Sequence, residues 1–287
     1  MITGFDHAPV TVRDLDAAVE RYGLLFGRGA SWIGALDGAR HAWFQLANIA
    51  IEVIAADGEG KTGDNIRRWF EQGGGEGPSA LGFATPAFDE ARRMLDRRGV
   101  GMRAAEESRS IDAAGQERSW RYAMADAANT RGIQLFLVDR PERGPAWPAS
   151  PVVGDEAAAV AAIDHVVVRS ANPEASIALY GAKLDLDLRL DRSNPSWGSR
   201  LLFFRCGDAI VEVGASLNAP LSDAPDRLGG FAWRVPEPEA AHARMCAAGL
   251  DVSELRKGRK VGTSVFTVRD AVGGPNLIIS AASAADD

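Results

Sequence analysis

Two histidines and two glutamates occupy matching places in the chain, and their side chains have the chemistry of metal ligands and proton carriers. His7 and Glu52 lie in the first half, and His165 and Glu212 lie in the second. Imidazole nitrogens and carboxylate oxygens bind divalent Fe, Mn, Zn, Ni or Co, and a carboxylate in an apolar setting can also act as a general base. These four residues are therefore candidate metal ligands, and Glu52 and Glu212 are candidate catalytic groups.

The segments that carry these residues repeat each other. Residues 5–10 (FDHAPV) match residues 163–168 (IDHVVV) at an offset of 158, and residues 43–53 (WFQLANIAIEV) match residues 203–213 (FFRCGDAIVEV) at an offset of 160. Each of the longer segments predicts two strands around a turn-forming pair, Ala47-Asn48 or Gly207-Asp208. A helix is expected after each histidine strand, ending at the Tyr-Gly pair of Gly23 or Gly181.

A second type of unit follows each of these. It begins at residues 80–86 (ALGFATP) and 230–236 (GFAWRVP), and each copy continues into a helix that ends in glycine, at Gly99 and Gly249. Closing strands are expected over 120–124, 133–138, 264–269 and 276–280. The fold class predicted is α+β, with four βαβββ modules and cupped, mostly antiparallel sheets.

The predicted domain boundaries follow from this repeat and from a proline-rich stretch. The first domain covers 1–140, with modules 1–56 and 79–140, and the second covers 163–283, with modules 163–216 and 229–283. Residues 141–162 contain four prolines and an alanine-rich end, which is typical of an interdomain linker.

Composition excludes several functional classes. The 287 residues are 46% hydrophobic and carry a net charge of -7, so they predict a folded chain and no nucleic-acid partner. Cys206 and Cys246 form neither a disulfide framework nor a CxxC site, and no apolar run predicts export or a membrane span. The expected location is cytoplasmic, the partner is a small-molecule substrate, and the state is monomer or homodimer. The glycines of residues 58–63 spell GxGxxG, but inside an antiparallel module they predict a loop.

Tandem βαβββ modules with histidine on the first strand and glutamate on the last resemble the vicinal-oxygen-chelate superfamily of glyoxalases, bleomycin-resistance proteins and extradiol dioxygenases. The resemblance implies two paired modules around a divalent metal (Fe, Mn, Zn, Ni or Co). One first-strand and one last-strand residue of each module hold that metal, with vacant positions for a substrate that chelates through neighbouring oxygens. It assigns His7, Glu52, His165 and Glu212 as ligands. In the second-type modules the ligand positions fall on Ala80 and Gln134, and on Gly230 and Ile279, so no pair of modules offers four standard ligands.

Module pairing stays open at this point. If neighbouring modules pair, His7, Glu52 and Gln134 form the site; if the halves exchange partners, His165, Glu212 and Gln134 form it; and if the two histidine modules face each other, four ligands meet. The substrate-binding residues predicted around the cup are His41, Trp43, Arg121, Arg200 and Trp233. The leading hypothesis is a glyoxalase-like enzyme with lyase, isomerase or dioxygenase type chemistry, using a divalent metal with a reduced ligand set. Its rival is a metal-free binding or sequestering protein of the bleomycin-resistance kind.

Overall fold

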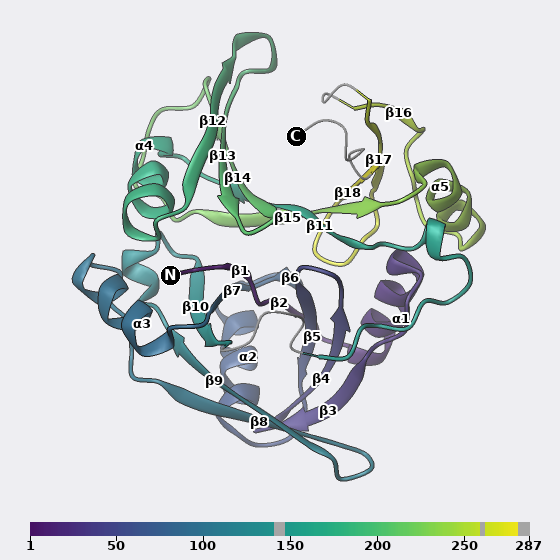
Figure 1. Cartoon of the computed structure of the whole chain (residues 1–287), viewed down its shortest axis with the longest axis horizontal. Helices are drawn as coiled ribbons and strands as arrows, with labels where there is room; N and C mark the ends of the chain where they lie inside the picture. Colours follow the sequence, from purple (N-terminus) through teal and green to yellow (C-terminus); the bar gives the residue numbers. More distant parts are fainter. Residues whose placement is uncertain (141–146, 259–261, 281–287) are drawn as a thin grey trace.

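The computed structural model describes residues 1–140, 147–258 and 262–280 and shows two curled β-sheets, one above the other (Figure 1). Strands between residues 4 and 139 form the first sheet, and strands between residues 162 and 280 form the second. The predicted α+β class is confirmed. Two parts of the predicted boundaries, linker residues 141–146 and module residues 281–283, lie outside the described residues.

The first sheet runs in the order β1-β7-β10-β9-β8-β3-β4-β5-β2-β6. Its strands are Gly4–Phe5 (β1), His7–Thr11 (β2), Trp32–Leu36 (β3), Ala39–Gln45 (β4), Ala50–Ala56 (β5), Gly77–Pro78 (β6), Ala80–Thr85 (β7), Glu106–Asp112 (β8), Glu117–Met124 (β9) and Gln134–Asp139 (β10). Strands β2 and β5 pair in parallel, as do β7 and β10, and the remaining neighbours are antiparallel. The two modules of the first half therefore share one sheet, which answers the open question of pairing.

This first sheet closes on itself. Residues 4–11 pair with β7 through β1 and with β5 through β2, so the two ends of the sheet meet along one stretch of chain. Strands β3 and β8 join the two modules at the opposite seam, where Gly34 pairs with Asp112. A Cβ atom on Gly34 would lie 2.4 Å from Ser110 Oγ, so the seam needs a residue without a side chain. The result is a barrel with no open edge between its modules.

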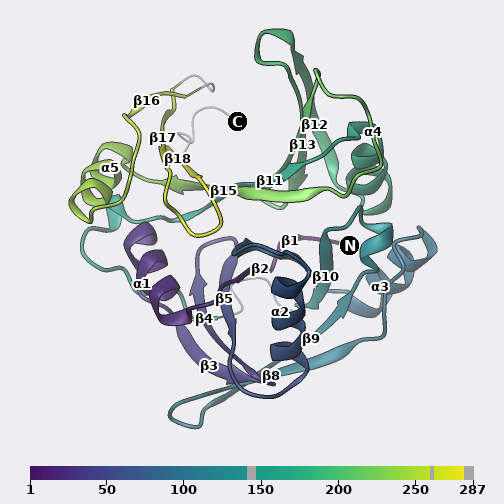
Figure 2. The same cartoon turned by 180° about the vertical axis from the view of Figure 1, so that it is seen from behind.

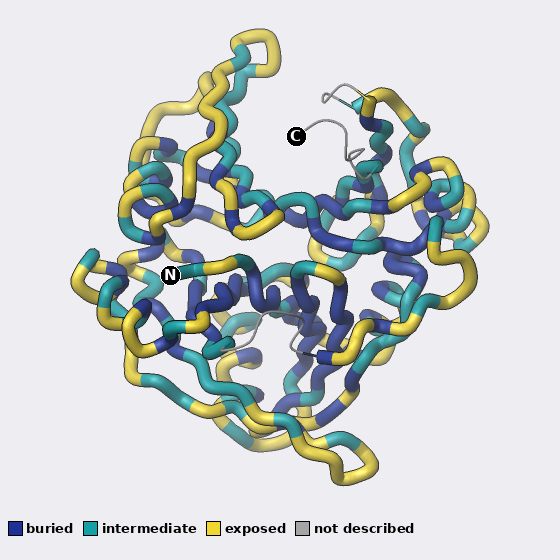
Figure 3. The backbone as a smooth tube through the Cα atoms, in the orientation of Figure 1, coloured by how far each residue is buried: buried dark blue, intermediate teal, exposed yellow. Residues whose placement is uncertain are grey.

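The second sheet stays open. Its order is β12-β13-β14-β11-β15-β18-β17-β16, so β12 and β16 are its edges. Its strands are Ala162–Arg169 (β11), Asp187–Asn194 (β12), Ser199–Cys206 (β13), Ala209–Ser216 (β14), Arg227–Val235 (β15), Arg256–Lys257 (β16), Ser264–Val268 (β17) and Asn276–Ser280 (β18). Figure 3 shows the difference between the domains, because β12 is exposed along almost its whole length whereas β4 and β5 are almost entirely buried.

Helices pack against the sheets and end where the backbone turns left-handed. They are Leu15–Phe26 (α1), Lys61–Glu71 (α2), Phe88–Arg97 (α3), Pro173–Ser176 (α4) and Pro238–Ala247 (α5). Helix α2 packs on the inner side of the first sheet, where Ile66 joins Leu36, Ala39 and Ile54, and in the view of Figure 2 it lies between β5 and β9. The side chains of Asp14 and Asn172 cap α1 and α4 by accepting from backbone N–H groups.

The predicted stops at Gly23 and Gly181 are wrong. Helix α1 continues to Gly27, which takes φ 63°, and α4 continues as a wide π-helical turn over Ile177–Lys183. Asp185, with φ 63°, then supplies the left-handed residue after that turn.

The domains pack back to back across a shared core. The rings of Phe26 and Trp233 lie 4.9 Å apart in an edge-to-face contact, and Arg244 donates hydrogen bonds to the carbonyl oxygens of Leu24 and Leu25. The convex side of the second sheet is therefore buried, and its inner side faces away from the first domain (Figure 1). Among the described residues, no helix has the length and apolar character required to cross a membrane.

Candidate functional site

The fold brings each histidine to its glutamate. His7 on β2 and Glu52 on the parallel neighbour β5 lie on the same side of the sheet, with His7 Nε2 3.6 Å from Glu52 Oε2. In the second domain, β11 and β14 pair in the same way and place His165 Nε2 3.4 Å from Glu212 Oε2. The repeat seen in the sequence is thus a repeated geometry.

An aspartate and an arginine stand behind each histidine. His7 Nδ1 lies 2.6 Å from Asp6 Oδ1, and Arg140 Nε donates to Asp6 Oδ2 over 2.8 Å. Burial raises the pKa of Asp6, but the hydrogen bond and charge of His7 and the charge of Arg140 outweigh it and hold that pKa below its usual value. An ionised carboxylate can only accept, so Nδ1 of the histidine carries the hydrogen.

The second domain has the same arrangement. His165 Nδ1 lies 2.8 Å from Asp164 Oδ1, and Arg234 Nε donates to Asp164 Oδ2 over 3.0 Å. Burial raises the pKa of Asp164, but His165 and Arg234 lower it below its usual value. In both domains, therefore, Nδ1 of the histidine is held by the aspartate and Nε2 faces a glutamate oxygen. The adjacent Asp-His pairs at 6–7 and 164–165 were the sequence signal for this support.

In the first domain the glutamate is also fixed from its other side. The indole Nε1 of Trp32 donates to Ser110 Oγ over 2.8 Å, Ser110 Oγ lies 2.6 Å from His41 Nε2, and His41 Nδ1 lies 2.6 Å from Glu52 Oε1. The indole Nε1 of Trp43 also donates to His41 Nδ1 over 3.0 Å, so His41 is held by Ser110, Trp43 and Glu52 together. Both oxygens of Glu52 are thereby occupied, and its side chain is only 6% exposed.

Aromatic rings fill the barrel around this chain. Trp43 lies 4.7 Å from the His7 ring and stacks on Trp147 at 4.4 Å between ring centroids. Trp147 belongs to the predicted linker, and its backbone N–H donates to the Gln45 side chain over 3.3 Å. Neither Trp147 nor Ser110 was identified from the sequence, because no local pattern marks a side chain that enters a barrel from a distant segment.

The second domain leaves its glutamate accessible. The side chains of His165 and Glu212 are 11% and 18% exposed, against 3% and 6% for His7 and Glu52. Leu201 stands at the repeat position of His41, so no described residue hydrogen-bonds to the second oxygen of Glu212. Val167, Leu201 and Phe203 share this inner face and are half-buried, which gives the pair an apolar surround open to a ligand.

The opposite wall of the first domain is apolar. Ala80 pairs with Gln134 as His7 pairs with Ala50, so Phe136, two residues beyond Gln134, takes the place that Glu52 has in its own module. The Phe136 ring lies 4.9 Å from the His7 ring. Within the described part of the chain, Gln134 makes no polar side-chain contact with His7 or Glu52, so its metal role stays a prediction. No group of three or more His, Cys, Asp or Glu side chains fit to hold a metal is found among these residues.

Three of the predicted substrate-binding residues have other partners. Arg121 contacts both oxygens of Asp89, Arg200 contacts both oxygens of Asp191, and Trp233 lies in the interdomain core with its indole N–H on Asn276. Substrate contact by these three residues stays an untested prediction. His41 and Trp43 do lie beside His7 and Glu52, as described above.

Replacing Ser110 by alanine should lower the free energy of unfolding by about 1–3 kcal/mol, because it leaves the buried His41 and Trp32 nitrogens without a partner. Urea unfolding followed by circular dichroism measures this change. Ser108→Ala, two positions earlier on β8 and without a hydrogen-bond partner among the described residues, is the matched control and should cost under about 0.5 kcal/mol. Equal losses in both variants would contradict the chain of bonds described for His41.

Two family profiles match the chain. The profile described as glyoxalase-like domain covers residues 5–184, which is more than half of the chain. The second profile, that of the glyoxalase, bleomycin resistance protein and dioxygenase superfamily, covers residues 162–274. No curated protein matches the chain in sequence.

Solved structures share the fold over nearly the whole length. A mutant 4-hydroxymandelate synthase from Streptomyces coelicolor has TM-score 0.66 at 13% identity, covering 98% of this chain and 93% of that one. A Mn(II)-bound glyoxalase from Novosphingobium aromaticivorans has TM-score 0.66 at 14% identity, covering 97% and 82%. The halotolerant catechol dioxygenase BphC has TM-score 0.60 at 12% identity, covering 98% and 87%. With the profile match over residues 5–184, the chain belongs to the glyoxalase-like family of the vicinal-oxygen-chelate superfamily.

Proposed function

We propose that this protein is a small-molecule enzyme that moves a proton on an oxygen-chelating substrate, in a reaction of isomerase or lyase type, at His165 and Glu212. The observation that carries the proposal is the distance of 3.4 Å between His165 Nε2 and Glu212 Oε2. Because Asp164 holds Nδ1 of His165, Nε2 and the carboxylate oxygen converge on one place where a proton or a cation can lie between them. The repetition of this geometry at His7 and Glu52 supports an inherited function for the pair.

The distance between His165 Nε2 and Glu212 Oε2 fits a divalent metal, and so does the carboxylate that lies behind the histidine. Two ligand atoms about 2.1 Å from one ion lie about 3.4 Å apart when they subtend an angle near 110°. A carboxylate on the distal nitrogen of a ligating histidine is the usual means of orienting it, and Asp164 supplies that here. His165 and Glu212 would hold the ion, with water or substrate oxygens in its other positions. When bound, the ion supplies Lewis-acid polarisation of a substrate oxygen.

The chain's own residues supply orientation and proton transfer. Arg234 fixes Asp164, and Asp164 fixes the tautomer and direction of His165. Glu212 has one oxygen without a described partner and lies beside apolar Val167, so it can accept a proton from the substrate and return it to another atom. The glutamate ends each cycle in its starting state, and no oxidant is needed.

The first domain is less suited to this role. One oxygen of Glu52 lies 2.6 Å from His41 Nδ1 and the other faces His7, and the Trp43 and Trp147 rings stack beside this cluster. We therefore assign the working centre to the open second domain and a structural role to the buried pair in the first.

The test uses purified protein stripped of metal and reloaded with Mn²⁺, Fe²⁺ or Zn²⁺. It is assayed against catechols, 2-hydroxy ketones and thiol adducts of 2-oxoaldehydes, with proton exchange in D₂O as the readout. Metal-dependent exchange or turnover of one of these classes is expected. Tight stoichiometric binding without exchange or turnover, unchanged by chelator, would instead establish the sequestering function, which the absence of donors at Gly230 and Phe136 favours.

Asp164→Asn should weaken Mn²⁺ binding about 10–100-fold, because an amide orients His165 less strongly than a carboxylate does. Titration followed by the Mn²⁺ electron paramagnetic resonance signal measures the affinity. Asp208→Asn is the matched control, since Asp208 also contacts Arg234, at 3.5 Å, but touches no histidine. The same affinity in wild type and Asp164→Asn would contradict the supporting role of Asp164.

A further inference from the structure

Two arginines stand directly opposite each other in the second domain. Arg169 ends β11 and Arg227 begins β15, and the register of these antiparallel strands pairs one with the other. Both are exposed, and neither side chain makes a hydrogen bond or ion pair with any residue in the described ranges. Like charges directly opposite across a strand pair destabilise a sheet. The fold therefore carries an unfavourable charge pair that a bound anion would neutralise.

Four other arginines on or beside strands are neutralised by carboxylates. The pairs are Arg121–Asp89, Arg200–Asp191, Arg234–Asp164 and Arg269–Asp251. The chain has 39 acidic residues and 32 Lys and Arg residues, so carboxylates are not scarce. Arg205 on β13 also has no ion pair among the described residues, but its cross-strand neighbours are Asp187 and Ile210. Arg169 and Arg227 differ in that each faces another arginine.

Both arginines line one pocket of about 250 Å³, together with Ser170, Ser216 and a loop that includes Pro225. Whole-ligand pockets typically measure about 300–1,000 Å³, so this one suits a single group of a larger molecule. Guanidinium groups bind carboxylate and phosphate oxygens in forked geometry, and serine hydroxyls can add donors.

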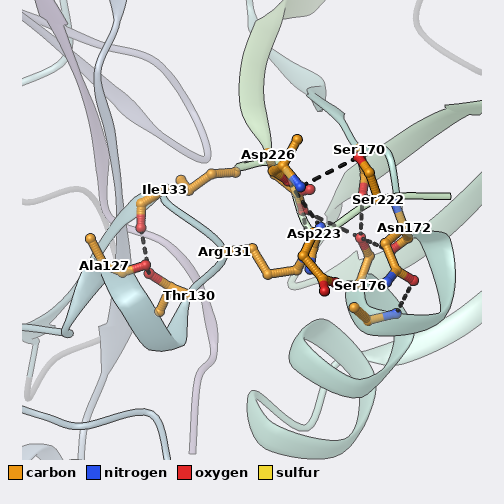
Figure 4. Close-up of polar contacts among 12 residues, drawn as sticks. Ala127, Thr130, Arg131, Ile133, Ser170, Asn172, Ser176, Ser222, Asp223 and Asp226 are labelled. Carbon is orange, nitrogen blue, oxygen red and sulfur yellow. Dashed lines mark hydrogen bonds and ion pairs between the residues drawn. The ribbon is translucent and has the colours of Figure 1, made fainter.

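Two carboxylates of the segment that lines this pocket already have partners (Figure 4). Asp226, next to Arg227 in the chain, is buried and accepts from Arg131 of the first domain over 3.0 Å and from Ser176 over 3.3 Å. Asp223 accepts from Asn172 over 3.4 Å. Arg131 thus holds the pocket loop from the neighbouring domain and leaves the positive charge of Arg169 and Arg227 uncompensated.

The pocket adjoins the proposed reaction centre. Side chains alternate along a strand, so Arg169 shares the inner face of β11 with His165 and Val167. Val167 pairs with Glu212, and Arg169 is two residues further along, about 7 Å away at the rise of a strand. Gly214, which pairs with Arg169, has no side chain to separate the two places.

We propose that Arg169 and Arg227 bind the oxyanion, carboxylate or phosphate, of the molecule on which His165 and Glu212 act. The inference rests on the proposed function and names its substrate class: an acidic compound with an apolar body. The body lies over Val167 and its half-buried neighbours, and the anionic end lies between the arginines.

Calorimetric titration of the full chain with inorganic phosphate, and then with phenyl phosphate, tests the site without knowledge of the substrate. Wild type should bind both, and phenyl phosphate more tightly because its ring meets the inner face. The R169Q/R227Q double variant should lose at least tenfold in affinity for each. R97Q, at an exposed arginine on α3, is the matched control and should bind as wild type does.

Thermal unfolding without phosphate gives a second readout. R169Q and R227Q should each melt at or above the wild-type temperature, because each removes one of two repelling charges. Unchanged phosphate affinity in R169Q/R227Q, or an equal loss in R97Q, would overturn the inference.

Two measurements together separate the two proposals: phosphate binding by Glu212→Gln, and turnover of oxygen-chelating compounds by wild type. If Glu212→Gln still binds phosphate through the arginines and wild type turns over none of these compounds, the anion site stands and the proposed reaction fails. If turnover occurs but phosphate binding does not depend on the arginines, the reaction stands and this inference fails.

Discussion

Glu212→Gln should lower kcat for the substrate found in the Mn²⁺, Fe²⁺ or Zn²⁺ assays by about 10²–10⁴-fold, the range of a general acid–base contribution. Glutamine keeps the size and one oxygen of the side chain but cannot accept and return a proton. The free energy of unfolding should change by less than about 0.5 kcal/mol, because Glu212 is half-buried and one of its oxygens has no described partner. Steady-state kinetics and urea unfolding measure the two effects on the same preparation.

Glu52→Gln is the matched control, since it makes the same substitution in the repeated geometry of the first domain. It should lower stability, because Glu52 is buried between His7 and His41, and it should leave kcat within about threefold per folded molecule, a change of under about 1 kcal/mol in the barrier. A loss of turnover in Glu52→Gln with full activity in Glu212→Gln would place the reaction in the first domain and contradict our assignment.

Trp147→Ala should destabilise the protein by about 3–5 kcal/mol, as expected when a buried tryptophan leaves a cavity. The Trp147 side chain is buried, stacks on Trp43 at 4.4 Å and lies 5.6 Å from the ring of Trp32. Its removal takes away the ring that fills the barrel beside His7 and Glu52. Urea unfolding followed by far-ultraviolet circular dichroism measures the loss without relying on tryptophan fluorescence.

Trp197→Ala provides the comparison for this effect. Trp197 is 46% exposed in the second domain, with Arg192 over its ring at 5.7 Å, so its removal should cost under about 1 kcal/mol. If Trp147→Ala costs no more than Trp197→Ala, then Trp147 does not hold the first barrel closed, and the structural role assigned to that domain loses its main support.

The part of the site within one module could be predicted from the sequence. The predicted turn at Ala47-Asn48 places Trp43 opposite Glu52 by counting outward from the turn, and the structure shows that pairing. Alternation then places His41 on the same side. The hairpin pattern therefore predicts the contact between His41 and Glu52 more closely than a general place at the cup.

Contacts between modules could not be predicted in the same way. Ser110 and Trp147 reach the cluster from segments 69 and 102 residues away from their partners, His41 and Gln45. Their positions depend on how the sheet closes, which no local pattern encodes.

Closure itself depends on one small residue. Gly34 pairs with His41 at the seam of the first barrel, where a Cβ atom would meet Ser110. In the second domain the residue that pairs with Leu201, the counterpart of His41, is Arg192. A large charged side chain at this position is incompatible with the same close approach, which agrees with β12 remaining an edge. Two halves of one repeat thus give a closed barrel and an open cup.

The register of the strand that carries Gln134 is a second feature that the sequence does not encode locally. The segment 132–136 was matched to the ligand strand by its local pattern, but the pairing of β7 with β10 places Phe136 at the equivalent of Glu52. Register between distant parallel strands is set by tertiary packing, and a shift of two residues keeps the same side of the strand while changing which side chain faces His7.

The most direct test of the central claim uses the four histidines of the chain as reporters. Protein labelled with ¹³C-histidine gives a ring signal for each of His7, His41, His165 and His242, and substoichiometric Mn²⁺ broadens the signals of ring nuclei close to it. A working centre at His165 and Glu212 predicts that the His165 signal broadens first, that His7 and His41 stay sharp, and that Glu212→Gln weakens the effect. Broadening of His7 before His165, or equal broadening of all four signals, would contradict a working centre at His165 and Glu212.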